Sequence, residues 1–174
     1  GPVTEDGQTA AENDYTSFTI TTEDGTRYIF GLPTLAYFSN GFSGPTTYVS
    51  TWRLQAILGP DYTGPTQYDQ IGTSSSAGQW IKMSYYYGLD GTQVDHGQIY
   101  TKVERAQILH QFTYPQQIEP PTHIAKFITS IRNDKDLSIG GVLFFHKRLD
   151  RIELYERANP TQPIKKGEFS YTTD

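Results

Sequence analysis

Residues 18–31 read FTITTEDGTRYIFG. Phe18 and Ile20 alternate with threonines, and Tyr28 and Phe30 resume the alternation after a short polar interval. A period of two places the large side chains of a strand on one face. The polar interval contains Gly25, which can adopt a positive φ, as hairpin turns require. This stretch therefore predicts two antiparallel strands joined by a tight turn.

Period-two patterns recur along the chain. Residues 80–87 place Ile81 and Met83 on one face of a strand and Lys82 and Ser84 on the other. Further short strands are expected at 48–58, 124–131, 142–146, 152–155 and 166–171. Residues 100–114 fit either a helix around 103–111 or a long strand, and the missing capping signal favours the strand. The expected fold is all-β, an antiparallel meander or sandwich of strand-turn-strand units with at most one short helix.

The length of 174 residues is that of one domain. Residues 1–13 predict a disordered leader, and their opening Gly1-Pro2 resembles the scar of a cleaved tag. Residues 14–174 predict a single β-rich module. Within it, residues 59–78 are rich in proline, glycine and serine, which predicts a mobile or partner-facing loop.

Three segments share an aliphatic-x-x-Ile spacing: residues 52–57, 127–131 and 148–152. Each is followed by a strand rich in aromatic residues, at 81–87, 142–145 and 167–171. Such strand-turn-strand units must stack to bury their faces. The core expected from this spacing and from alternation consists of Phe18, Ile20, Leu54, Ile57, Ile81, Met83, Ile131, Ile152 and Phe169.

Composition excludes several classes of function. The formal net charge is −5 and the basic residues are scattered, so a nucleic-acid footprint is missing. No window approaches the apolar length of a membrane span. The chain has no cysteine, which excludes disulfides and thiolate chemistry and is compatible with export from bacteria.

No motif predicts catalysis, a metal or a cofactor. The four histidines (His96, His110, His123 and His146) are not at ligand spacing. The segments 133–136 and 90–95 fit polar turns better than a calcium loop. Four carboxylates are catalytic candidates by residue type alone: Glu104, Glu119, Asp136 and Glu153.

The aromatic residues admit a second function. Trp52, Trp80 and residues 85–87 could stack on sugar rings, although packing within the sheet is the favoured interpretation. Neighbouring side chains point to opposite faces, and the face of Trp80 and Tyr86 also carries polar residues. That face is therefore expected to be wet. Trp80, Tyr86 and Trp52 are the candidate ligand-binding residues of this alternative.

The hairpin at 18–31 and the Trp-x-Leu-x-x-Ile strand at 52–57 resemble a segment of bacterial Rhs and YD-repeat proteins, including the B component of insecticidal toxin complexes. Residues 78–85, 148–155 and 169–171 are similar to further elements of that group. The resemblance implies a non-catalytic shell or scaffold module of a secreted or cell-surface bacterial protein. Its partners would be neighbouring domains of the same chain or another protein. The alternative is a carbohydrate-binding module of an exported enzyme or adhesin, with a polysaccharide as partner.

Overall fold

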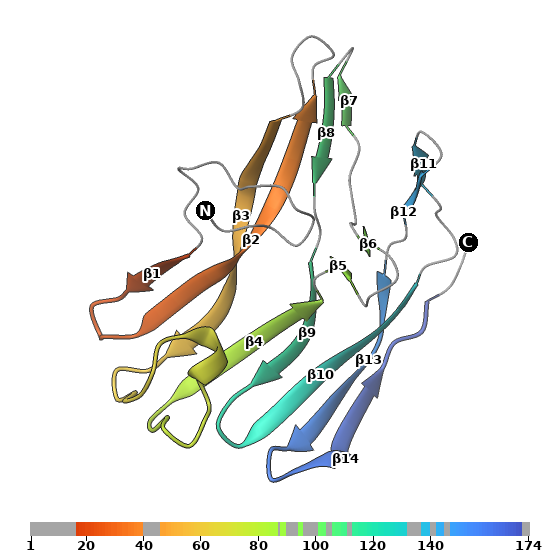
Figure 1. Cartoon of the computed structure of the whole chain (residues 1–174). Helices are drawn as coiled ribbons and strands as arrows, with labels where there is room; N and C mark the ends of the chain where they lie inside the picture. The colour runs from red at the N-terminus through yellow and green to blue at the C-terminus, as the bar shows by residue number, and fades with distance from the viewer. Residues whose placement is uncertain are drawn as a thin grey trace.

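The computed structural model describes residues 17–39, 46–86, 88–89, 94–95, 101–103, 106–110, 113–131, 137–139, 142–144 and 147–171 (Figure 1). The predicted leader lies outside the described residues. Where the chain is described, the regular elements are strands apart from one 3-10 turn, η1 (Tyr68–Gln70), so it holds no helix long enough to cross a membrane. The all-β class is confirmed. The helix considered at 103–111 is replaced by strand in the described part of that segment.

One antiparallel sheet of ten strands contains most of the structure. Its order is β14-β13-β10-β9-β4-β3-β2-β8-β7, and β1 pairs with β2 outside this path. Two small ladders, β5-β6 and β11-β12, stand apart. The strands are β1 (Phe18–Thr21), β2 (Arg27–Ser39), β3 (Thr46–Leu58), β4 (Trp80–Tyr86), β5 (Gly88–Leu89), β6 (Val94–Asp95), β7 (Thr101–Val103), β8 (Ala106–His110), β9 (Tyr114–Glu119), β10 (His123–Ile131), β11 (Leu137–Ile139), β12 (Val142–Phe144), β13 (Lys147–Glu156) and β14 (Asn159–Glu168).

The hairpin predicted at 18–31 is confirmed as β1 and β2. Gly25 has φ 85°, and the Thr22 amide donates to the Thr26 carbonyl at 2.9 Å. Asp24 accepts from the Thr22 hydroxyl at 2.6 Å and from the Thr26 amide at 3.0 Å. These hydrogen bonds, the one from Thr22 first, lower the pKa of the Asp24 carboxyl. The turn is therefore held by hydrogen bonds among its own residues.

The β2–β3 ribbon is the longest pairing in the sheet and is visibly twisted in Figure 1. Because β3 pairs along one edge of β2, the strands β1 and β8 share the other edge, at opposite ends of β2. The β2–β3 register shifts at three places between residues 29 and 35 of β2. Such bulges increase the local twist and allow one strand to serve two differently oriented parts of a sheet.

Two of the three expected strand-turn-strand units are adjacent strands of the sheet. The strand containing residues 52–57 pairs with β4, and β13 pairs with β14. The middle unit is wrong: β10 pairs with β13, and β12 pairs with β11. Spacing alone cannot distinguish a local hairpin from a pairing that skips the next segment, because both have the same residue pattern.

The register divides the sheet into two faces. The first, which we call the capped face, carries Leu58 opposite Trp80 and Ala56 opposite Lys82. Residues 59–79, which we call the cap, connect β3 to β4 and pack over this corner. The buried apolar cluster consists of Ala56, Leu58, Tyr62, Ile71 and Trp80.

The cap is an ordered part of the core. Tyr62 and Ile71 from the cap are 5% and 2% exposed. The Tyr62 hydroxyl donates to the Pro65 carbonyl at 2.8 Å, and Thr63 pairs with Ala77 as an isolated bridge. The prediction of an irregular connection at 59–78 is confirmed, but the loop contributes its large side chains to the sheet instead of offering them to a partner.

Trp80 lies at the centre of this arrangement. A Cβ placed on Gly72 would lie 2.6 Å from the Trp80 ring, so the cap backbone lies directly against it. The Arg157 guanidinium lies 4.7 Å from the centre of the same ring and donates to the Gly72 carbonyl at 2.6 Å. The turn between β13 and β14 is thereby fastened to the cap, 85 residues away in sequence.

The expected core is only partly right. Phe18, Ile20, Ile131 and Phe169 are exposed, at 40–48% of their surfaces. The other five expected core residues are half-buried: Leu54, Ile57, Ile81, Met83 and Ile152. Alternation identifies residues that share a face, but not which face another part of the chain will cover.

Gly72→Ala is expected to lower the free energy of unfolding by at least about 2 kcal/mol. The backbone at Gly72 has φ 81°, which costs a residue with a side chain about 1–2 kcal/mol, and the new methyl group would displace the Trp80 ring. Urea denaturation followed by tryptophan fluorescence measures the change.

Gly167→Ala is the matched control. A Cβ at Gly167 meets nothing within 4 Å, so the same substitution there is expected to be neutral or to stabilise by about 0.5–1 kcal/mol. Equal effects at the two glycines would contradict the packing of the cap on Trp80.

Candidate functional site

Trp80, the first of the three candidate ligand-binding residues, is only 6% exposed and belongs to the core. The expectation that the face of β4 carrying Trp80 is exposed to solvent is wrong at the start of this strand. The prediction rested on Lys82 and Ser84, which do share the face of Trp80. The cap, however, folds back over the first residues of β4, and a strand pattern carries no information about where a following or preceding loop will pack.

The other two predicted residues lie elsewhere. Tyr86, at the far end of β4, is half-buried, and the Lys147 ammonium lies 4.6 Å from the centre of its ring. Trp52 is half-buried in β3, opposite Pro33, and meets Phe18 edge-on with ring centres 5.6 Å apart. The structure therefore does not bring Trp80, Tyr86 and Trp52 together into one aromatic platform.

The second face of the sheet, which we call the open face, carries a continuous row of apolar residues. Directly opposite residues of neighbouring strands lie on the same face. The register links Ile20 to Tyr28, Tyr28 to Ile57, and Ile57 to Ile81. Two residues further along β4, Met83 continues the row across the other half of the sheet to Ile118, Ala125 and Leu154.

None of these open-face side chains is buried. Ile20 is 48% exposed, and the members of the row on β2, β3, β4, β9, β10 and β13 are half-buried. Phe127 opposite Ile152 lies beside them on the same face and is also half-buried. The more extensive contacts among the described strands join hydrogen-bonded neighbours, so these strands form one layer. Packing against a partner would therefore remove further apolar surface of this row from water.

An aromatic cluster extends the open face at the β1 end. Phe18, two residues from Ile20 on the same strand, stacks on Phe30 with ring centres 4.9 Å apart. Trp52 closes this cluster from β3. Phe18 is 40% exposed, which leaves one ring of the cluster available at the surface. The alternation at 18–30 was the sequence signal for this cluster, although it was taken as a signal for core.

The opposite, capped face carries a group of charged residues beyond the cap. Lys126, Glu153 and Lys166 are directly opposite one another on β10, β13 and β14. Glu153 is buried and accepts from the Arg151 Nε at 2.8 Å and from the Tyr155 hydroxyl at 2.5 Å. The hydrogen bond from Arg151, followed by that from Tyr155, lowers the pKa of the Glu153 carboxyl. Each charge in this group has a partner, which is the organisation of a structural network.

Stability should depend on pH through Glu153. Its pKa is lower in the folded protein than in the unfolded chain, so its stabilising contribution is present above the unfolded value of about 4.3. That contribution is lost as the pH falls through the folded pKa. Glu153→Gln is therefore expected to cost most at neutral pH, and the difference from the wild type should shrink below about pH 4 in denaturation curves.

Asp24→Asn is the comparison variant, because its pKa is also lowered but its hydrogen bonds lie within the β1–β2 turn. A Glu153→Gln difference that stayed constant from neutral to acidic pH would contradict an ionised Glu153 as the stabilising form.

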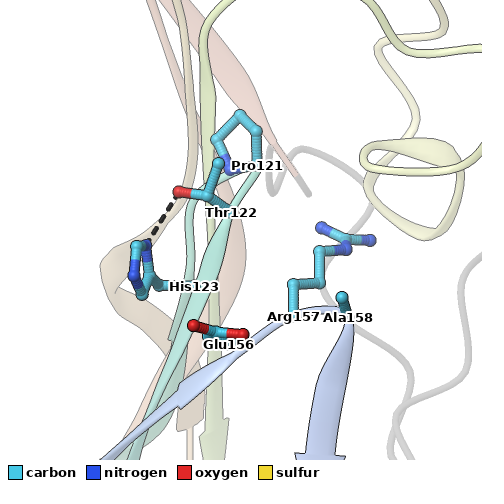
Figure 2. Close-up of a pocket in the computed structure, with 6 residues that line it drawn as sticks. All are labelled: Pro121, Thr122, His123, Glu156, Arg157 and Ala158. Atoms are coloured by element: carbon cyan, nitrogen blue, oxygen red, sulfur yellow. Dashed lines mark hydrogen bonds between the residues drawn. The ribbon is translucent and has the colours of Figure 1, made fainter. Parts of the chain in front are cut away.

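An open hollow lies at the turn that joins β13 to β14 (Figure 2). Its lining residues are Pro121, Thr122, His123, Glu156, Arg157 and Ala158. The Thr122 hydroxyl and His123 Nδ1 are 2.8 Å apart, and Figure 2 shows His123 and Arg157 on opposite sides of β10. Since the guanidinium of Arg157 is engaged by Trp80 and Gly72, the hollow offers no convergent set of free charges.

The remaining candidates do not assemble into a site within the described residues. No group of three or more metal-ligating side chains occurs there. Glu119 lies 3.8 Å from Arg157, and Glu153 is held by Arg151, so each carboxylate faces a cation. Glu104, Asp136, His96, His146 and the segment 133–136 lie outside the described residues, as does Asp90.

Comparison with known proteins gives no relative. No family model, no curated protein and no solved structure matches the chain. The two faces of the sheet and its edges are therefore the basis on which function is argued.

Proposed function

We propose that this chain is a non-catalytic structural or interaction module of a larger exported bacterial protein, and that its open face packs against a neighbouring domain or partner protein. The observation that carries the proposal is the unburied apolar row that runs from Ile20 to Leu154. An antiparallel sheet normally has one solvated and one packed face. Here the capped face holds the cap and the charged group around Glu153, whereas the apolar row of the open face is not buried, so the open face is the one that requires packing.

The size of the row supports this role. It crosses six strand-to-strand steps, from β1 to β13. At about 4.8 Å per step, the row is about 29 Å long. Two residues deep, at about 3.4 Å per residue, it covers roughly 200 Å² in projection, which approaches the few hundred Å² above which contiguous apolar patches become rare on monomers. A sheet with one apolar face is stable in water when a second layer covers that face.

The resemblance to Rhs and YD-repeat proteins supports a shell or scaffold as the setting. The two similar units that contain β3–β4 and β13–β14 are adjacent strand pairs in one sheet. A shell built from such units would place each open face against neighbouring chain. Absence of cysteine is compatible with export, which is part of the same proposal.

Carbohydrate binding is the alternative, and one observation favours it. The cluster of Phe18, Phe30 and Trp52 has an exposed ring, and the Gln55 side chain lies against Gly31 beside it. Such a pair could bind a sugar, because the aromatic ring stacks on the sugar ring and the amide binds its hydroxyl groups. If this function is correct, Phe18→Ala will abolish polysaccharide retardation in affinity electrophoresis without changing the melting temperature. No retardation of the wild type by any glycan removes this alternative.

Met83→Lys tests the proposed interaction face. Met83 is half-buried at the centre of the open face, so a charge there is expected to reduce binding of a hydrophobic dye and to weaken concentration-dependent association. Ser84→Lys is the matched control, because Ser84 is the next residue of β4 and lies on the polar, capped face. Dye fluorescence and sedimentation velocity measure the two effects.

Equal dye binding by the Met83→Lys and Ser84→Lys variants, with both folded by circular dichroism, would contradict an interaction surface on the open face. A larger loss of dye binding in the Ser84→Lys variant would place the interaction surface on the capped face.

A further inference from the structure

The outer edge of β1 presents main-chain groups that no described strand pairs with. The Thr22 amide donates to the Thr26 carbonyl, so residues 22 and 26 are a hydrogen-bonded pair. Hydrogen-bonded and non-hydrogen-bonded pairs alternate along an antiparallel ladder. In the β1–β2 register, Ile20 and Phe18 therefore direct their amides towards β2. The amides and carbonyls of Thr19 and Thr21 point away from β2, towards the open edge.

This edge lacks the devices that protect edge strands elsewhere in the molecule. β1 reads Phe-Thr-Ile-Thr, its four residues are exposed, and it contains neither proline nor charge. The path of the sheet ends at two other strands: β14 carries Pro160, Pro163, Lys165 and Lys166, and β7 carries Lys102. Prolines and lysines on an edge strand prevent pairing with another chain. The contrast identifies β1 as the edge that can accept a further strand.

We propose that two copies of this chain pair through β1, antiparallel and centred on Ile20, to form one continuous sheet. In this register Thr19 lies opposite Thr21 of the second copy, and Thr21 opposite Thr19. These are the residues whose main-chain groups point outwards, so each pair exchanges both of its hydrogen bonds. Ile20 lies opposite Ile20 of the second copy at the two-fold axis, as an isologous interface requires.

The same register brings exposed apolar surface together. Ile20 is 48% exposed on the open face, and pairing would bring it against an identical side chain. The apolar rows of the two copies then become continuous. The hydrogen bonds of this interface lie along an edge of the sheet, whereas the proposed function concerns the open face, with which the interface shares Ile20.

The test is a charge exchange at Ile20, made in the Met83→Lys background to suppress association through the open face. Ile20→Glu and Ile20→Lys each place identical charges opposite one another and are expected to be monomeric in sedimentation velocity. An equimolar mixture is expected to restore dimers, because the unlike charges then face each other across the axis. The Met83→Lys parent should itself form dimers as its concentration rises.

A monomeric parent at every concentration, or a mixture that stays monomeric, would overturn the pairing. Unchanged dimers of the single Ile20 variants would do the same. If either Ile20 variant fails to fold, Thr19→Pro replaces it, because proline removes only the outward amide of β1 and should abolish the dimer. These results are independent of dye binding, so the failure of the open-face proposal is recognised separately.

Discussion

The contact of Trp80 with the cap and with Arg157 determines how this sheet is organised. The indole lies against the backbone of Gly72 on one part of its ring and under the Arg157 guanidinium on another. Arg157 in turn binds the Gly72 carbonyl and lies 3.8 Å from Glu119 at the end of β9. The contact therefore joins the cap, β4, β9 and the turn between β13 and β14. It also holds together the buried apolar cluster at one corner of the capped face.

The two faces of the sheet have different properties. Beyond the cap, the capped face carries a charged group in which Lys126, Glu153 and Lys166 alternate in charge across three strands. On neighbouring positions of the same strands, the open face carries the apolar row, and none of its side chains is buried. A single layer of this kind buries less apolar surface than a two-layer domain of similar length, and hydrophobic stabilisation is proportional to the area buried. This imbalance is the physical basis for the proposed interaction role of the chain.

The edges of the sheet differ in the same way as the faces. Prolines and lysines protect β14, whereas β1 is short, uncharged and aligned with the exposed end of the apolar row. β1 can occupy this position because β2 is long enough to pair with β1 at its start and with β8 at its end. The bulges between these two regions rotate the ribbon, so the two neighbours of the same edge do not compete.

The sequence by itself determined the local structure. Alternation at 18–30 and 80–86 predicted strands correctly, and Gly25 marked the turn, because strand period and turn chemistry depend on residues close together in the chain. Tertiary structure decided which residues are buried. Trp80 and Ile20 have the same local pattern, yet Trp80 is 6% exposed under the cap and Ile20 is 48% exposed. It also decided that β10 pairs with β13 and that Arg157 reaches Gly72. These contacts connect residues far apart in the chain, and a strand pattern is equally compatible with either face being covered.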